Sequence, residues 1–294
     1  MSTKAKTAEP AHDPETGEVI EAPKTALAAT DYDYGDDIGG GFENQTSEDV
    51  SIPFITILQP GSPEVQGEDA PAKAGMFRNS TTGEFLSGKH GLRFVPALTQ
   101  HLLVEWIPKD PKTGGGGGYV GPHEIDSDLA RKVRESQPLG TYKHPTNDND
   151  LVETFYVYGA MVDEEGNGAP AVLGFSSTHI SPYKAWMYRA RSIVLALPDG
   201  RKQTNLPLFS HRYRITTELK SKGGNSWYVP KVDFDGENAA AARLRPSDDL
   251  YRIAKEVKEA ISAGNARAAP ETARPERVDA APARDDSNPE KAPY

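Results

Sequence analysis

The sequence predicts a mainly β protein with a minor α content. Five strand-like stretches of alternating or β-branched residues lie between residues 92 and 234. A helix-like segment falls between the third and the fourth of them, and an amphipathic segment follows the fifth. This order matches an OB-fold, which is a five-stranded and partly open Greek-key barrel. We therefore expect an OB-like antiparallel barrel with a helix between strands three and four and a C-terminal helix. An open antiparallel α+β sheet is the alternative.

The first three expected strands come from composition and turn signals. The first covers 92–107, in two apolar or alternating runs, 92–98 and 101–107, that are separated by Thr99 and Gln100. Residues 152–162 are rich in Thr, Phe, Tyr and Val, which favour strands. A cluster of Asp, Glu, Gly and Asn follows, so residues 171–176 are expected to return as a hairpin partner.

The last two strands form a second hairpin. Residues 209–219 alternate, with Arg212 and Arg214 on the polar side, and 227–234 return after a Gly-Gly turn. In the return strand we expect Trp227 and Lys231 on one face.

Each of the two helices has start and stop signals. Ser181 can cap a helix that places Pro182 in its first turn and runs to about residue 197. The second begins at Ser247 and ends before Gly264, which suits a left-handed C-terminal residue. Its apolar residues fall on one stripe: Leu250, Ile253, Ala254, Val257 and Ile261.

Composition divides the chain into three parts. Residues 1–45 are an acidic arm and 265–294 a tail that ends in Pro293-Tyr294, and both are expected to be disordered because they have too few apolar residues to bury. The core spans 46–264, with a Gly-rich insertion at 108–150. The chain has no cysteine, which excludes disulfides and thiol chemistry, and no apolar run long enough to cross a membrane.

A basic segment stands out against the net charge of -10. Residues 176–222 hold nine Lys and Arg against Asp199 and Glu218, a net of +7. Local charge asymmetry of this kind indicates a polyanionic partner.

Aromatic residues interleave with these cations, a mixture that suits single-stranded nucleic acid, because cations bind phosphates and flat rings stack on bases. The expected phosphate-binding residues are Lys184, Arg189, Arg191, Arg212, Arg214, Lys220, Lys222 and Lys231. The expected stacking residues are Tyr156, Tyr158, Trp186 and Trp227. For Trp186, a place in the core is the alternative.

Two other functions stay open. Asp199, Glu218 and Lys220 fit the loose Pro-Asp…Glu-x-Lys pattern of metal-dependent nucleases. The basic face could instead bind an acidic protein. The glycine run at 114–118 lacks the Gly-Lys-Ser/Thr ending of a phosphate loop, and no histidine spacing suggests a metal site. We expect no cofactor and no bound metal.

The chain resembles a family of tailed-phage and prophage proteins that are assigned as single-stranded-DNA-binding proteins. The resemblance covers about residues 42–262. It lies in residues 42–44, 47–49, 52–54, 57–59, 62–65, 83–84, 105–108, 119–121, 209–213 and 227–228. It implies a non-catalytic role in phage DNA replication or recombination in the cytoplasm of the bacterial host, with a homodimer left open.

The tail carries a separate expectation about protein partners. Asp285 and Asp286 precede the terminal Pro293-Tyr294. Acidic tails that end in an aromatic residue after proline occur in phage and bacterial single-strand-binding proteins. We expect this tail to recruit a phage polymerase, helicase or recombinase.

Overall fold

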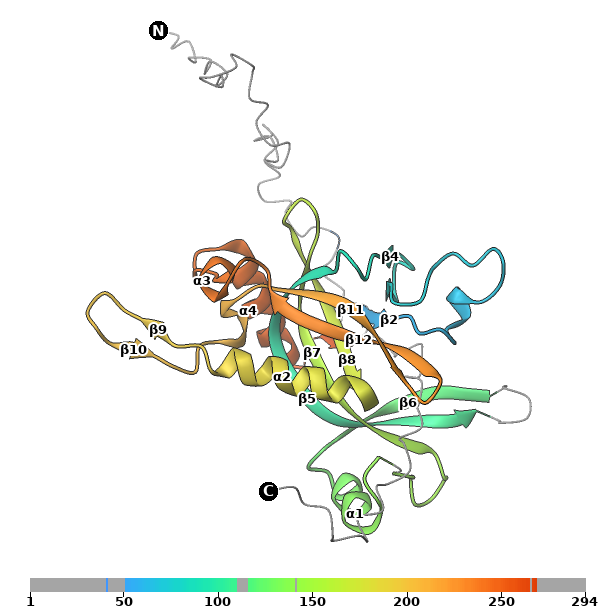
Figure 1. The fold of residues 1–294 in the computed structure, drawn as a ribbon. Helices are drawn as coiled ribbons and strands as arrows, with labels where there is room; N and C mark the ends of the chain where they lie inside the picture. The colour runs from blue at the N-terminus through green and yellow to red at the C-terminus, as the bar shows by residue number, and fades with distance from the viewer. Residues whose placement is uncertain (1–40, 42–50, 110–115, 141, 265, 269–294) are drawn as a thin grey trace, which may run out of the picture.

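The computed structural model describes residues 41, 51–109, 116–140, 142–264 and 266–268. Among these residues, nine strands form one large sheet (Figure 1). They are β2 (Phe54–Ile57), β3 (Phe77–Asn79), β4 (Phe85–Leu86), β5 (Leu92–Lys109), β6 (Gly116–Glu124), β7 (Asp150–Val162), β8 (Gly168–Ser176), β11 (Tyr213–Lys222) and β12 (Asn225–Phe234). The mainly β prediction is therefore confirmed.

The strand order is β12-β11-β5-β7-β8-β2-β3-β4, with β6 paired to β5 beside this path. Neighbours run antiparallel except β2 and β8, which are parallel. Strands β5, β7 and β8 follow one another as neighbours, and β11 returns to the other side of β5, which is the spatial order of a Greek key. The hydrogen-bonded strands of the described residues do not close a ring, so the expected barrel is not confirmed.

Strand β5 is a single strand of 18 residues, and the expected break at Thr99 and Gln100 is wrong. Both residues pair with β7, opposite Val157 and Tyr156. At roughly 3.3 Å per residue the strand is nearly 60 Å long. This length lets one edge pair with β11 at its start and with β6 at its end.

Two helices cover opposite faces of the sheet. Helix α4 (Asp249–Ser262) packs on the face that holds Tyr156, Tyr158 and Val172. Its expected stripe is confirmed, because Ala254 and Val257 are buried while the other stripe residues pack on the same core. Gly264 ends the helix with φ +75°, as expected. Helix α2 (Ile180–Arg191) packs on the other face, which holds Phe155 and Val157.

Helix α2 is shorter than predicted. It begins after a 3-10 turn at Ser177–His179 and ends at Arg191, so Ser181 lies inside the helix and does not cap it. The β-branched residues Ile193 and Val194 follow, and they favour extended backbone. In place of the last helical turns, β9 (Leu195–Ala196) and β10 (Lys202–Gln203) form a two-stranded arm that extends away from the sheet (Figure 1).

The insertion at 108–150 builds ordered structure. Part of its glycine run lies in β6, which pairs with the end of β5. Helix α1 (Asp128–Ser136) follows, capped by Ser127, whose side chain accepts a hydrogen bond from the Ala130 amide. Helix α1 packs against β5 and β7 around a small separate core: Leu103, Ala130, Val133, Tyr142 and Leu151.

The remaining elements are short. Strands β1 (Ser51–Ile52) and β13 (Arg267–Ala268) pair in parallel, so the first residues of the expected tail join the core. Helix α3 (Ala239–Ala242) is a single turn capped by Asn238. In the part of the chain that the structure describes, none of the helices has the length and apolar character needed to cross a membrane.

Candidate nucleic-acid interface

Helix α2 lies along the outer edge of the terminal strand β12. Arg189 fixes it there, because its guanidinium donates to the Val232 carbonyl and pairs with Asp233 at 3.2 Å. The same guanidinium lies 5.4 Å from the centre of the Phe234 ring. A sheet edge covered in this way cannot pair with another strand. The outer side of α2 therefore forms the surface of the molecule beside β12.

The two sides of α2 carry different residues. Tyr183 and Trp186 point into the core beneath the helix, with Met187 and Ala190 packed against the same core. Lys184, Tyr188 and Arg191 follow the opposite spacing of i, i+4 and i+7 and are exposed. Tyr188 keeps 78% of its surface in solvent. The result is an outward stripe of cation, aromatic ring and cation.

Charge pairing separates the expected phosphate-binding residues into two groups. Four of them, in addition to Arg189, contact carboxylates: Arg212 and Arg214 with Asp235 at 3.5 and 2.8 Å, Lys220 with Glu218 at 2.9 Å and Lys231 with Asp233 at 3.3 Å. Lys184, Arg191 and Lys222 have no ion pair among the described residues. These three are the cations that a phosphate could meet without displacing an acid.

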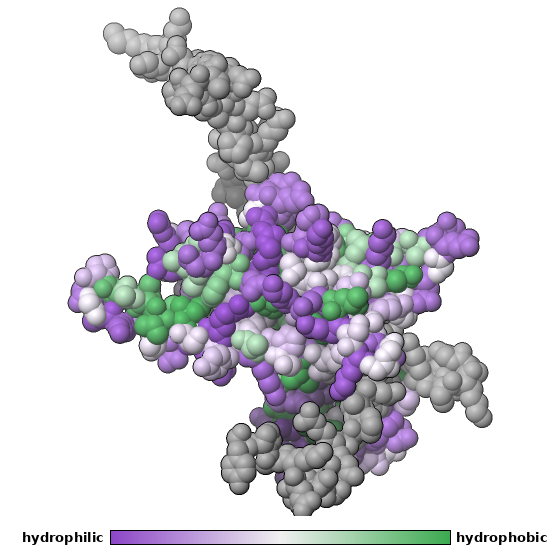
Figure 2. All heavy atoms as spheres, viewed as in Figure 1, coloured by the Kyte–Doolittle hydropathy of each residue, from purple (hydrophilic) through white to green (hydrophobic). Residues whose placement is uncertain are grey.

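Helix α2 and the β11–β12 hairpin lie side by side (Figure 1). Figure 2 shows them from the same direction, where hydrophilic residues cover much of the area and hydrophobic residues gather over the β9–β10 arm. Val194, at the base of this arm, is 52% exposed.

Three of the four expected stacking residues are buried: the expectation is wrong for Tyr156 and Tyr158, and for Trp186 the alternative of a place in the core is confirmed. Tyr156 and Tyr158 are 1% and 5% exposed, because α4 packs over their face of β7. The Tyr158 hydroxyl donates to Oε1 of Gln100 at 3.0 Å, and burial raises its pKa. Trp186 is 1% exposed and packs against Phe175 and Tyr213.

Tyr188 is the aromatic residue that sequence reasoning missed. It lies two residues from Trp186, so on a helix the two rings point in different directions. The helical period placed Tyr183 and Trp186 on one stripe and Tyr188 on the other. That signal was available in the sequence.

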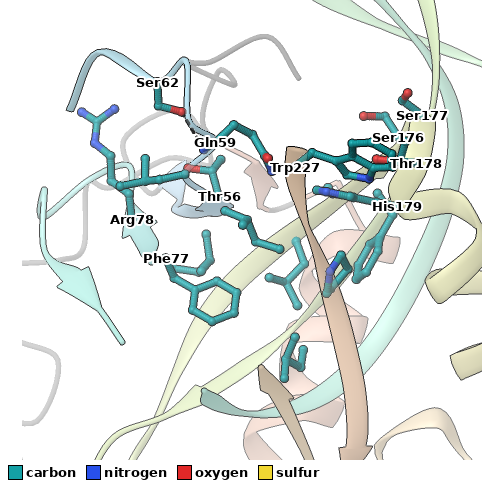
Figure 3. A pocket seen from close by; sticks show the side chains of 18 of the residues that line it. Thr56, Gln59, Ser62, Phe77, Arg78, Ser176, Ser177, Thr178, His179 and Trp227 are labelled. Atoms are coloured by element: carbon teal, nitrogen blue, oxygen red, sulfur yellow. Dashed lines mark hydrogen bonds between the residues drawn. The ribbon is translucent and has the colours of Figure 1, made fainter. Parts of the chain in front are cut away.

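Trp227, the fourth expected stacking residue, is half-buried and lines a cavity of about 90 Å³. The cavity lies between β2 and β3, the end of β8 and the hairpin β11–β12. In Figure 3, Trp227 lies beside the segment from Ser176 to His179, and Arg78 and Ser62 lie on the far side. The His179 ring donates from Nε2 to the Tyr228 carbonyl at 2.9 Å, and burial lowers its pKa.

The residues of the nuclease pattern have separate environments. Asp199 lies at the turn of the β9–β10 arm and binds Arg201 at 2.7 Å. Glu218 lies on β11 and binds Lys220, the third residue of the pattern, at 2.9 Å. In the described part of the chain, no group of three or more His, Asp or Glu side chains is arranged to hold a metal ion.

The predictions for the two ends of the chain concern residues that the structure does not describe. Asp285, Asp286, Pro293 and Tyr294 lie outside the described residues, as does almost all of the acidic arm. Recruitment of replication proteins by the tail stays a prediction from the sequence.

Fold and surface together define a mainly β protein with a mixed sheet, helices on both faces and a basic, aromatic-bearing helix at one edge. The family model described as "Pam3 phage gp34-like protein" matches residues 22–267, and the chain belongs to this phage family. The expected membership of a phage protein family is confirmed at this level. Neither the curated proteins nor the solved structures contain a match.

Proposed function

We propose that this protein binds single-stranded DNA, without catalysis, during phage DNA replication or recombination. The observation that carries the proposal is the outward stripe of Lys184, Tyr188 and Arg191 on α2. Single-strand binding needs cations that follow the backbone and rings that stack on bases regardless of sequence. Helix α2 is 12 residues long, about 18 Å, so the stripe suits a few nucleotides of an extended strand.

The topology supports an OB-like reading of the core. OB-folds are partly open Greek-key barrels, and β11, β5, β7 and β8 follow the Greek-key order with α2 between the third and fourth strands. In an OB-fold the third and fifth strands pair and close the barrel. The corresponding strands here are β8 and β12, and β2 pairs with β8 in place of β12.

The usual binding face of an OB-fold is covered in this protein, which favours α2 as the interface. OB-folds bind oligonucleotides on the face of their second and third strands and on the adjoining loops. Those strands correspond to β7 and β8 here, and α4 covers the outer face that holds Tyr156 and Tyr158. The loop between the fourth and fifth strands corresponds to the β11–β12 turn, where Lys220 and Lys222 are exposed. We therefore place the strand on α2 and this turn.

The proposal is tested by fluorescence anisotropy with labelled single- and double-stranded oligonucleotides of equal length, at several salt concentrations and with Mg²⁺ present. We expect preference for the single strand, no cleavage, and a log affinity that falls by about 0.7 per phosphate contact for each unit of log salt. Cleavage would favour the nuclease, and the absence of both binding and cleavage would favour an acidic protein partner. Either result would overturn the proposal.

A further inference from the structure

The cavity beside Trp227 lies outside the proposed stripe on α2. We propose that it holds a single unpaired nucleobase, which stacks on Trp227 and hydrogen-bonds through its edge to Ser177 and Thr178. This inference rests on the proposed function for the strand that supplies the base. A free mononucleotide tests the cavity by itself.

The lining of the cavity suits a flat ring with a polar edge. Its apolar part comes from Ile55, Phe77, Leu173, Ile215 and Pro230. Its polar part includes the hydroxyl groups of Ser176, Ser177 and Thr178. Ligand pockets with mostly apolar walls and a few convergent polar groups select ligands by the position of those groups. A nucleobase offers an apolar face to the indole and donors and acceptors at its edge.

Ser177 has an unusual backbone conformation at this place. Its φ is +50°, a left-handed value that is uncommon for a residue with a side chain. Strained residues of this kind cluster at ligand sites, where the surrounding structure holds them. Within the described part of the chain, the hydroxyls of Ser177 and Thr178 have no hydrogen-bond partner, so both are available to a ligand.

The charges around the cavity place a phosphate outside it. Arg78 is bound to Glu64 at 2.7 Å, so the cationic group in the lining already has its counter-ion. Lys220, directly across the β11–β12 pair from Trp227, binds Glu218 at 2.9 Å, but Lys222 at the same turn is exposed and has no ion pair among the described residues. A base stacked on Trp227 would therefore bring its phosphate toward an exposed lysine. The ligand class is a nucleotide whose base enters and whose phosphate stays at the rim.

The cavity also connects to the proposed stripe. The segment Ser177–His179 lines it and leads directly into α2. Lys184 follows within the first two turns of the helix, and Tyr188 and Arg191 lie further along. A strand with one base in the cavity could continue over all three. The cavity would then fix the register of the strand on the protein.

The test is a titration of the full chain with each deoxynucleoside monophosphate, followed by tryptophan fluorescence. Trp106 and Trp186 are 2% and 1% exposed, so quenching reports on Trp227. We expect saturable quenching that is absent with deoxyribose 5-phosphate, which lacks a base. Equal binding of the sugar phosphate by calorimetry, or no binding of any mononucleotide, would overturn the inference.

Variants assign the contacts. Ser177→Ala and Thr178→Val each remove one hydroxyl, and each should weaken mononucleotide binding by about three- to tenfold, as for one neutral hydrogen bond. Ser181→Ala is the matched control, because Ser181 is exposed on α2 outside the cavity lining. Thermal unfolding checks that each variant is folded. Unchanged affinity in both cavity variants would contradict the proposed contacts.

The outcomes separate the two proposals. Oligonucleotide binding without mononucleotide binding would reject the base cavity and leave the function intact. Mononucleotide binding without oligonucleotide binding would reject the function and leave a nucleotide site. Tyr188→Ala should weaken the oligonucleotide and leave the mononucleotide unaffected, because Tyr188 is on the outer side of α2 and is not in the cavity lining.

Discussion

Gln59 and Tyr228 belong to segments far apart in the strand order, yet they exchange two hydrogen bonds. The Tyr228 amide donates to Oε1 of Gln59 at 2.9 Å, and Nε2 of Gln59 donates to the Tyr228 carbonyl at 3.0 Å. The side-chain amide thus pairs with β12 as a peptide group of a neighbouring strand would. It joins the end of β2 to the terminal strand and holds the sheet in a curled shape.

Two glycines allow this approach. A Cβ atom on Gly75, which has φ +86°, would lie 2.4 Å from the Tyr228 ring. A Cβ atom on Gly88 would lie 1.8 Å from the Gly75 carbonyl oxygen. The Thr217 hydroxyl donates to the same carbonyl at 2.6 Å. The loops beside β3 and β4 therefore contact the β11–β12 hairpin through backbone that has no room for a side chain.

The first prediction concerns this bridge. Gln59→Met keeps the side-chain size but leaves the Tyr228 amide without its acceptor, which should lower the free energy of unfolding by about 1–3 kcal/mol. Gln59→Glu keeps the acceptor and sets a carboxylate against the carbonyl, so it should not restore stability. Urea unfolding measures both. Gln66→Met is the control, since Gln66 donates to Pro60 at an exposed site. If Gln59→Met lowered the free energy of unfolding no more than Gln66→Met does, the hydrogen bonds between Gln59 and Tyr228 would not be stabilising.

The second prediction separates core rings from surface rings. Trp186→Ala should destabilise the fold by about 3–5 kcal/mol, as for other buried aromatic residues. Tyr188→Ala should leave thermal stability nearly unchanged and weaken single-strand binding by about 1–3 kcal/mol if its ring stacks on a base. Both are measured on the folded fraction at one salt concentration. If only Trp186→Ala lost binding, Trp186 and not Tyr188 would be the ring that contacts the strand.

The third prediction concerns charge. Arg191 has no ion pair among the described residues, whereas Arg214 binds Asp235 and donates to the His90 carbonyl at 3.1 Å. Arg191→Ala should reduce the salt slope of single-strand binding by about 0.7, which is one phosphate contact. Arg214→Ala should change the slope less and the unfolding midpoint more. If Arg214→Ala gave the larger slope change, the strand would lie on the sheet and not on the helix.

A fourth prediction concerns the buried carboxylate of Glu105 on β5, which binds side chains of the insertion. It accepts hydrogen bonds from Asn149 at 2.6 Å and Asn147 at 2.9 Å, and it pairs with His123 at 2.7 Å. Burial alone would raise the pKa of Glu105, but these hydrogen bonds outweigh it and hold the pKa below 4.5. Stability from this group is therefore present above pH 4.5 and is lost as the pH falls through the lowered pKa.

Glu105→Gln tests the cluster at neutral pH. The two Asn contacts to one oxygen can remain, whereas the charge facing His123 is lost. We expect faster amide hydrogen exchange in residues 142–150 and little change in β11 and β12. Uniform acceleration over the whole sheet would show that the insertion does not unfold as a separate unit.

The fifth prediction follows from two buried histidines. Burial lowers the pKa of His211, helped by Arg243, and burial also lowers the pKa of His179, both from 6.5. The unfolded chain then takes up protons first as the pH falls below about 6.5, so stability should decline from there toward the folded-state pKa. Thermal unfolding between pH 7.5 and 5.5 should show this decline. His211→Asn, which retains a partner for the Ser210 hydroxyl, should reduce the pH dependence. An equal pH dependence of stability in the variant and the natural chain would exclude His211 as a source of the decline.

Local patterns predicted most elements because they depend on near neighbours in the chain. The turn at 222–225, the stripe on α4 and the left-handed Gly264 are set by residues a few positions apart. The break at Thr99 and Gln100 was wrong because polar side chains do not interrupt a strand whose backbone stays paired with its neighbour, here β7. The end of α2 was wrong because Ile193 and Val194 were assigned to the helix when their branched side chains favour extended backbone.

The site was harder to predict, because exposure depends on what packs from a distance. Tyr156 and Tyr158 alternate with an apolar face, which normally indicates solvent on their side. They are buried by α4, which is almost a hundred positions further along the chain. The ion pairs of Arg212 and Arg214 with Asp235 likewise depend on the β11–β12 register. The cavity at Trp227 needs the approach of β2 to β12, which no local pattern reveals.

The parallel pairing of β1 with β13 brings the start and the finish of the folded core to one spot. Ile52 and Ala268 belong to the core beneath α4, whereas α2 packs on the opposite face of the sheet. A core of residues 51–268 tethered to a sensor chip through either of its ends would therefore present α2 to the solution. The same proximity makes this spot the natural place to join the old termini of a circular permutant and to open the chain elsewhere.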